Sequence, residues 1–274
     1  MHDEELLRAL VGLSERLLLA AHQRAGEGFG TKPDDARWPY PFPLRSDLQV
    51  KHLFVQMEDA FAVAWTNLAV RTSPTAIGAI RFLAEGYVLI RWLTEPTDET
   101  ERRKRAYRFV LREIGETLRV LKHADDAEPA TIRSLKESTG LLQDIAKQDG
   151  ILHLGESPRT AHLFDTYLEP GYVIFSTTSE IGSHPGLLQM MLFHQDRGSK
   201  QINVDLTGAV GERAAWVSIA FDIFGRTCDE MGKALGWNDW LAETVLPIVQ
   251  DAVPLLREAK SRWLTKWGFE PGDD

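Results

Sequence analysis

The chain has 274 residues and a formal net charge of −9 at pH 7. Its hydrophobic residues make up 43% of the sequence and its charged residues 26%, which is typical of a folded globular protein and argues against intrinsic disorder. The acidic balance argues against a surface built to neutralise nucleic-acid phosphates, although it leaves RNA binding in a local basic groove open.

A single cysteine, Cys228, excludes an internal disulfide and indicates a reducing compartment. The acidic N-terminus is not typical of a signal peptide. The most apolar stretch, residues 76–93, carries Arg81, Glu85 and Arg91, and a membrane span rarely accepts three charges. We therefore predict a cytoplasmic protein without a membrane span.

Most of the chain shows the three- and four-residue spacing of apolar side chains that is typical of amphipathic helices. Gly26 and Gly150 mark helix ends, and Ser73-Pro74 supplies an N-cap followed by proline at the first helical position. We predict helices over residues 3–25, 46–70, 75–94, 98–123 and 129–148, a short helix beginning at 157–158, and another helix over 172–184.

The segments between these helices carry different signals. Alternating prolines and aromatic residues over 27–47 predict an extended loop, whose rings either clamp it onto the core or form a lid or a partner-docking arm. Two apolar runs around a turn predict a small β-hairpin at about 188–206. Two long helices follow within 207–267, the second one kinked at Pro247 and Pro254.

The predicted fold is all-α: a single bundle of about eight helices, with one domain over residues 1–274 and one hydrophobic core. Tryptophans concentrate in the C-terminal third, which favours a homodimer through the C-terminal helices, although internal packing explains most of them equally well. These tryptophans are Trp216, Trp237, Trp240, Trp263 and Trp267.

The predicted helix 75–94 is apolar nearly all round, so we expect it in the middle of the bundle, wrapped on all sides. Arg81 and Glu85 nevertheless project from it, with Arg91 on a neighbouring stripe. Such charges must pair, reach water or line a polar cavity. Because Arg81 and Glu85 are four residues apart, the first interpretation is an internal ion pair. The second is a polar pocket in the bundle core.

The order of several motifs is similar to that of a family of bacterial helical proteins of unknown function. Its pattern is an Arg-x-x-x-Glu helix, then a basic helix with an aromatic residue, then a distal Tyr…Ser…His segment. The matching residues here are Arg81-Phe-Leu-Ala-Glu85, Ile90-Arg91-Trp92-Leu93, Glu101 to Phe109 with Tyr107, and Tyr172, Ser176 and His184. The resemblance covers roughly residues 55–195. It implies a helical fold and assigns no activity.

His184 is the histidine with the clearest chemical context. Glu180 precedes it by one helical turn and Pro185-Gly186 follows it. A carboxylate at that spacing raises the pKa of a histidine and fixes its tautomer, as a general base or a phosphate binder requires. The alternative is a histidine that caps its own helix. The candidate site residues are therefore Arg81, Glu85, Arg91, Tyr107, Glu180 and His184.

Few established chemistries match the sequence. No histidine has an acidic residue three positions before it, as ferritin-type di-iron sites require, and a single cysteine makes zinc improbable. A metal-dependent oxidase using Glu85, Glu180 and His184 is the weakest hypothesis, so we predict no metal or cofactor. The Arg-x₄₋₆-His spacing of HEPN ribonucleases occurs twice, as often as chance predicts, in Arg16…His22 and Arg45…His52.

Two functions remain open. The first is a bacterial helical protein that binds a small ligand or a protein partner, in regulation or in stress and defence responses, without catalysis. The second is an enzyme with a polar pocket in the bundle core, most plausibly a HEPN-like ribonuclease or phosphodiesterase. The basic cluster from Arg102 to Arg108 is either a phosphate- or partner-binding site or a solvated helix face.

Overall fold

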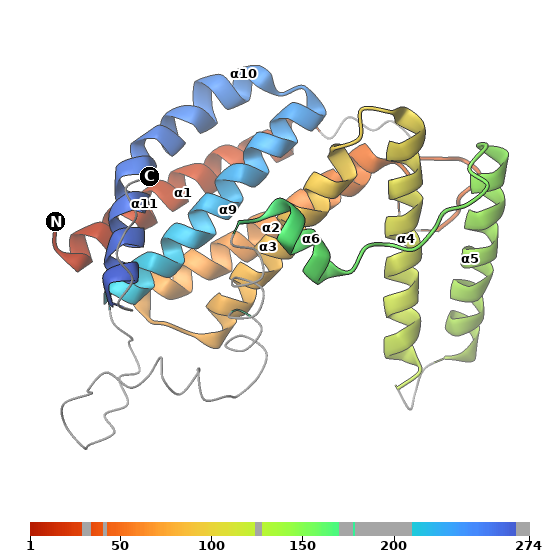
Figure 1. Cartoon of the computed structure of the whole chain (residues 1–274), viewed down its shortest axis with the longest axis horizontal. Helices are drawn as coiled ribbons and strands as arrows, with labels where there is room; N and C mark the ends of the chain where they lie inside the picture. Colours follow the sequence, from red (N-terminus) through yellow and green to blue (C-terminus); the bar gives the residue numbers. More distant parts are fainter. Residues whose placement is uncertain (29–33, 41–42, 124–127, 170–177, 179–209, 267–274) are drawn as a thin grey trace.

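The computed structural model describes residues 1–28, 34–40, 43–123, 128–169, 178 and 210–266. All regular secondary structure within these residues is helical and none is strand, which confirms the all-α class (Figure 1). The elements are α1 (Asp3–Gly28), α2 (Ser46–Val70), α3 (Pro74–Thr94), α4 (Glu99–Leu121), α5 (Pro129–Gln148), α6 (Thr160–Tyr167), α9 (Val210–Leu235), α10 (Asn238–Trp240), a π-helical turn (Leu241–Val245) and α11 (Leu246–Lys266).

Local sequence signals set most helix ends. The bounds predicted for α2 and α5 are confirmed, and those for α3 and α4 agree within two residues. The Ser73 hydroxyl accepts the Ala76 amide at 3.1 Å, and the Asp98 carboxylate accepts the Glu101 amide at 2.7 Å. Each cap satisfies one of the amides that a helix N-terminus leaves without an intrahelical partner.

Three predicted bounds need correction. α1 continues past Gly26 to Gly28. The short helix begins at Thr160 because the Ser157 hydroxyl donates to the Arg108 carbonyl instead of capping a helix. The last long helix is divided into α10, the π-helical turn and α11, with the wide turn ending two residues before Pro247, which has no amide hydrogen to donate.

Two predicted elements fall on residues that the structure does not describe. The helix over 172–184 and the β-hairpin at about 188–206 both lie outside the described residues. In the described part of the chain, no helix is both long and apolar enough to cross a membrane.

The main hydrophobic core lies between α1, α2, α3, α9 and α11 (Figure 1). At its centre, the Phe224 ring stacks on Phe61 at a centroid distance of 4.3 Å and on Phe54 at 5.9 Å. All three rings are fully buried, so they join α2 to α9 through apolar packing alone.

A second, separate cluster of buried residues corrects the prediction of one hydrophobic core. It lies between α4 and α5, the helical hairpin at the right of Figure 1, and it also takes in Trp38 and Leu44 from the segment that connects α1 to α2. Trp38 is 5% exposed, so the aromatic segment does clamp itself down, but onto this hairpin and not onto the main bundle. The cluster consists of Trp38, Leu44, Tyr107, Val110, Ile114, Leu142, Ile145, Ala146 and Ile151.

The C-terminal tryptophans pack within the chain where the structure describes their contacts. Trp216 and Trp237 are buried, and the Trp240 indole donates to the Ala20 carbonyl of α1 at 3.3 Å. The Arg24 guanidinium lies over the Trp237 ring, 4.9 Å from its centroid. These contacts tie α10 to α1, and the homodimer through the C-terminal helices stays a prediction.

Candidate functional site

The charged residues of α3 form the predicted ion pair. Arg81 Nη2 lies 2.9 Å from Glu85 Oε1, and Arg81 Nε donates to the same oxygen at 3.0 Å. The two side chains are 23% and 29% exposed, and Phe82 beside them is 43% exposed. The proposition that α3 is wrapped on all sides is therefore wrong, because these side chains on α3 are partly exposed to solvent. The pair is partly hydrated and needs no internal pocket.

The other predicted site residues pair elsewhere. Arg91 Nη1 donates to Glu230 of α9 at 2.7 Å, and the Tyr107 hydroxyl donates to Asp149 at the end of α5 at 2.5 Å. The structure therefore does not join either of them to the Arg81–Glu85 pair. Glu180 and His184 lie outside the described residues.

Tyr107 faces a cavity of about 500 Å³ between the two hydrophobic clusters. Its walls come from the segment after α1, the N-termini of α2 and α4, and the end of α5. All but one of its lining residues are polar or charged: Asp34, Asp35, Arg37, Leu44, Arg45, Ser46, Asp47, Glu99, Arg102, Arg103, Tyr107 and Asp149.

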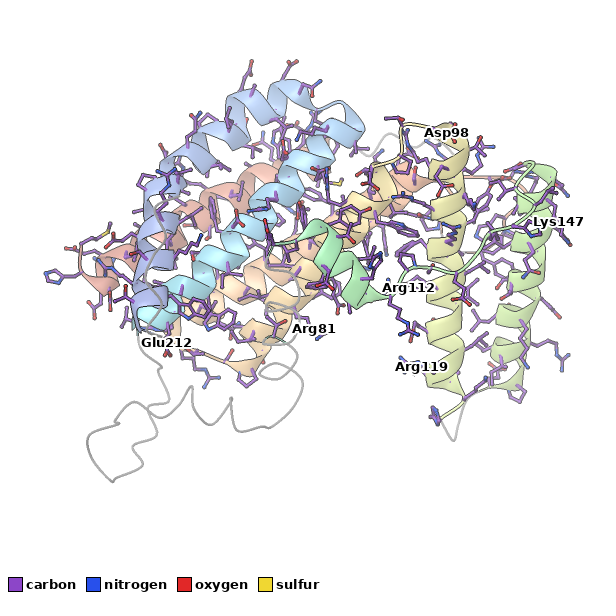
Figure 2. The ribbon with its side chains drawn as sticks, in the orientation of Figure 1. Arg81, Asp98, Arg112, Arg119, Lys147 and Glu212 are labelled. Atoms are coloured by element: carbon purple, nitrogen blue, oxygen red, sulfur yellow. The ribbon has the colours of Figure 1, made fainter. Side chains whose placement is uncertain are left out.

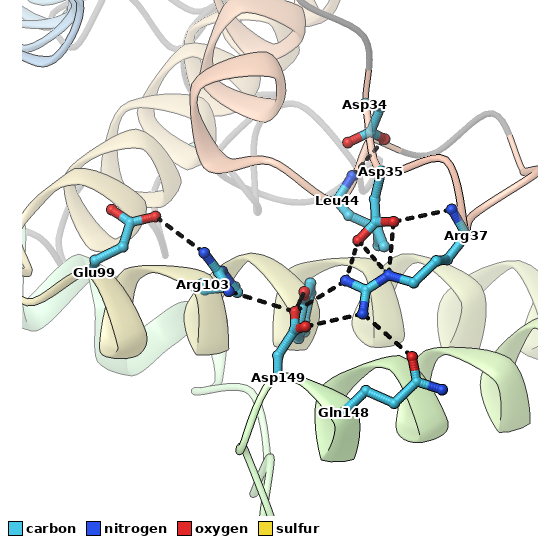
Figure 3. A network of polar contacts seen from close by, with 9 residues as sticks. Asp34, Asp35, Arg37, Leu44, Glu99, Arg103, Gln148 and Asp149 are labelled. Carbon is cyan, nitrogen blue, oxygen red and sulfur yellow. Dashed lines mark hydrogen bonds and ion pairs between the residues drawn. The ribbon is translucent and has the colours of Figure 1, made fainter.

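One arginine organises the floor of this cavity (Figure 3). Arg37 Nε donates to both oxygens of Asp35, at 2.9 and 3.1 Å. Its two terminal nitrogens donate to the two oxygens of Asp149, at 3.0 and 3.3 Å. Such paired geometry fixes the orientation of a guanidinium as well as its position. Arg37 thus locks the aromatic segment onto the end of α5.

The network holds its ionisable groups in fixed charge states. Burial raises the pKa of Tyr107, and its bond to Asp149 acts in the same direction. Burial also acts to raise the pKa of Asp149, but hydrogen bonds from Arg37 and Tyr107 outweigh it and lower that pKa. The hydrogen bond from Arg37 lowers the pKa of Asp35. At neutral pH the tyrosine is protonated and both aspartates are ionised.

Arg103 of α4 is held differently from Arg37. Its Nη1 lies 3.6 Å from Asp149 Oδ2 and its Nη2 lies 3.8 Å from Glu99 Oε1. Both separations exceed hydrogen-bond length, and within the described residues Arg103 forms no side-chain hydrogen bond. Its guanidinium, which carries five N–H donors, lines the cavity between these two carboxylates (Figure 3).

The N-terminus of α2 forms the opposite wall. Ser46 and Asp47, the first two residues of the helix, line the cavity. Arg45 occupies the N-cap position, and its side chain donates to the Asp47 carboxylate but accepts from no helix amide. Within the described residues, no side chain therefore caps the first amides of α2. The end of the helix dipole adds a partial positive charge at this wall.

A second cavity of about 420 Å³ adjoins the first. The two share Ser46, Asp47 and Arg102 in their walls. Arg91 lines only the second cavity, as does Lys233 of α9. Two residues singled out by sequence, Tyr107 and Arg91, therefore face adjoining cavities.

Two arginines of the basic cluster, Arg105 and Arg108, and Arg112 one turn further along α4, have a structural role that the sequence did not indicate. Arg105 donates to the Trp92 carbonyl at the end of α3 at 2.6 Å. Arg108 donates to the Leu154 carbonyl, and Arg112 donates to the Thr160 hydroxyl at 2.9 Å. These arginines join α4 to α3 and to the chain that follows α5, so they form neither a solvated face nor a ligand site.

Sequence reasoning missed the two residues at the centre of the network, Arg37 and Asp149. One sequence feature did indicate the position of Asp149: it precedes Gly150, and a glycine commonly follows the end of a helix. In the structure Gly150 has a φ of +78° and Asp149 is the C-cap residue of α5. Arg37 directly precedes Trp38, which is buried. The buried tryptophan fixes the position of the backbone beside it, and with it the position of Arg37. Neither signal gives the partner, because the two residues are 112 positions apart.

The HEPN-like spacings do not converge on one site. Arg16 pairs with Asp251 at 3.2 Å, whereas His22 lies 3.4 Å from Glu58. Arg45 pairs with Asp47, and His52 contacts Gln56 on its own helix. Among the residues that the structure describes, no group of three or more His, Cys, Asp or Glu side chains is placed to hold a metal ion.

Comparison of the chain with protein-family models, with curated protein sequences and with solved structures finds no significant match.

Proposed function

We propose that this protein binds a small ligand through an anionic group, a phosphate or a carboxylate, in the cavity between α2, α4, α5 and the Trp38 segment, and that it does so without catalysis. The observation that carries the proposal is Arg103. Its guanidinium faces the cavity, and the two carboxylates nearest to it among the described residues lie 3.6 and 3.8 Å away, beyond hydrogen-bond length.

The surroundings of Arg103 favour an anionic group over other ligand chemistry. An oxygen acceptor placed between Arg103 and the start of α2 meets unused guanidinium donors on one side and uncapped backbone amides on the other. The nearest carboxylate, Asp149, is already engaged by Arg37 and Tyr107. The volume of about 500 Å³ is within the usual range for small-molecule sites.

The charge states of the floor favour binding over acid–base catalysis. A general acid or base works best with a pKa near the operating pH. Here the pKa of Tyr107 is raised, and those of Asp35 and Asp149 are lowered, so all three move away from neutrality. At neutral pH the two aspartates are charged and the tyrosine is neutral, so the floor keeps a fixed charge state.

The Arg103→Gln variant tests the proposal. In isothermal titration calorimetry with inorganic phosphate and with acetate, we expect the variant to bind the preferred anion about tenfold more weakly than wild type. The reason is that a hydrogen bond to a charged group contributes about 1.5–3 kcal/mol.

Arg119→Gln is the matched control. Arg119 lies on the same helix at the end opposite Asp98, it is 73% exposed, and it pairs only with Glu116 within that helix (Figure 2). We expect this variant to bind as wild type does. Equal affinity of the Arg103→Gln variant and wild type would contradict the proposal, and turnover of an RNA or phosphodiester substrate by the purified protein would support the enzymatic alternative.

A further inference from the structure

The two adjoining cavities meet at the start of α2, and we refer to them together as the groove. Ser46, Asp47 and Arg102 belong to both walls, so these three residues lie where the two cavities meet. Arg103 lines only the first cavity and Arg91 only the second, which places Arg102 between them.

Each of the three arginines keeps hydrogen-bonding capacity on its guanidinium. Arg102 donates through Nε and Nη2 to the Pro96 carbonyl, at 3.3 and 3.0 Å, while its Nη1 lies 3.6 Å from Glu99. The side chain of Arg91 makes one hydrogen bond within the described residues, from Nη1 to Glu230. The groove therefore offers a row of donors and not a single one.

Three carboxylates along the second cavity accept hydrogen bonds from neighbouring groups. Glu230 accepts from Arg91, and Asp47 accepts from Arg45 through two nitrogens, at 3.0 and 2.6 Å. Glu95 accepts from Arg105 and from the Tyr167 hydroxyl, whose hydrogen bond lowers the pKa of the Glu95 carboxyl. These contacts offset the negative charge of the carboxylates along the path of a ligand.

We infer that the ligand of this groove is elongated and carries at least two anionic groups in series, as in a diphosphate or a longer phosphate chain, with one end at Arg103 and the other at Arg91 and Lys233. The inference rests on the proposed function, since it extends the same site, and it adds the chemical class of the ligand. A single anion occupies the first cavity alone, whereas a chain of phosphoryl groups reaches the donors of both cavities.

The test compares orthophosphate, diphosphate and triphosphate by calorimetry on the full chain, at matched ionic strength so that general screening is constant. We expect wild type to bind diphosphate or triphosphate at least tenfold more tightly than orthophosphate. In the Arg91→Gln variant we expect the ratio of these affinities to fall toward one, because the far end of the bound phosphate chain loses a hydrogen-bond donor.

Lys233→Gln is the second variant, because removal of Arg91 also leaves Glu230 without its partner. The Lys233 side chain is 60% exposed, and its one ion pair within the described residues is with Asp229 on its own helix, so we expect its replacement to leave the fold intact. We expect it to lower the same ratio, whereas Arg119→Gln keeps the wild-type ratio. Orthophosphate binding that depends on Arg103 but shows no gain with chain length would overturn this inference alone. Binding of none of these phosphates would overturn it too, and the proposed function falls as well if acetate also fails to bind.

Discussion

The Phe224→Ala variant is expected to lose about 3–5 kcal/mol of unfolding free energy, the range found when a buried phenylalanine is truncated. Phe224 is fully buried and stacks on both Phe61 and Phe54 of α2. Its removal opens a cavity between α2 and α9 that the surrounding helices cannot fill without moving. Urea denaturation followed by far-UV circular dichroism measures the loss as a lower midpoint with an unchanged slope.

Phe82→Ala serves as the control for this prediction. Phe82 belongs to α3 of the same bundle, but its side chain is 43% exposed, so truncation removes little buried area and leaves no cavity. We expect a loss under about 1 kcal/mol. If the two variants lost the same free energy, the phenylalanine cluster would not be the centre of the main core.

The helices themselves were predictable because their signals are local. Ser73 and Asp98 cap the helices that follow them, and Pro74 starts α3 where its missing amide hydrogen costs nothing. Each signal lies within a few residues of the boundary that it sets. The division at the π-helical turn before Pro247 escaped prediction, since proline allows a kink, a break or a wider turn at that place.

The choice of packing partner was not predictable in the same way. The apolar stripe of α4, with Tyr107, Val110 and Ile114, packs equally well in principle against any other apolar stripe. In the structure it packs against α5, and Trp38 completes the cluster from a distant segment. An apolar stripe in the sequence predicts which face of a helix is buried, but it does not predict which helix packs against that face. For this reason the sequence predicted one hydrophobic core, whereas the structure has two clusters.

The site shows the same division between local and distant contacts. The Arg81–Glu85 pair follows from a four-residue spacing on one helix, and the structure contains it. Tyr107 was singled out as a site residue from the sequence, but its partner Asp149 lies 42 positions away. Spacing rules relate residues that are three or four positions apart on one helix. The network around Arg37 joins residues much further apart in the sequence, so it could be found only from the three-dimensional structure.

Asp149→Asn is expected to cost about 2–3 kcal/mol at neutral pH, because hydrogen bonds to a charged group contribute about 1.5–3 kcal/mol and the variant leaves the donors of Arg37 and Tyr107 poorly matched. The Asp149 side chain is 11% exposed, so water replaces these contacts poorly. The control is Asp144→Asn, one turn earlier on α5, where the aspartate is 65% exposed and pairs only with Lys147. That variant is expected to lose less than about 0.5 kcal/mol.

The pH dependence of the Asp149→Asn effect provides a second readout of the same network. The folded protein lowers the pKa of Asp149 below its ordinary value of 3.8, so between the two values the unfolded chain binds more protons than the folded one. The stabilisation is therefore complete above the ordinary pKa and is lost as the pH falls through the lowered one. We expect the gap in unfolding free energy between wild type and Asp149→Asn to be constant from pH 7 to about pH 5 and to shrink below about pH 4, in urea titrations at each pH. If this difference in unfolding free energy stayed constant through the acid range, the asparagine side chain would destabilise the protein through its hydrogen-bonding geometry and not through its missing charge. The charge on Asp149 would then not be what holds Arg37 and the Trp38 segment against α5.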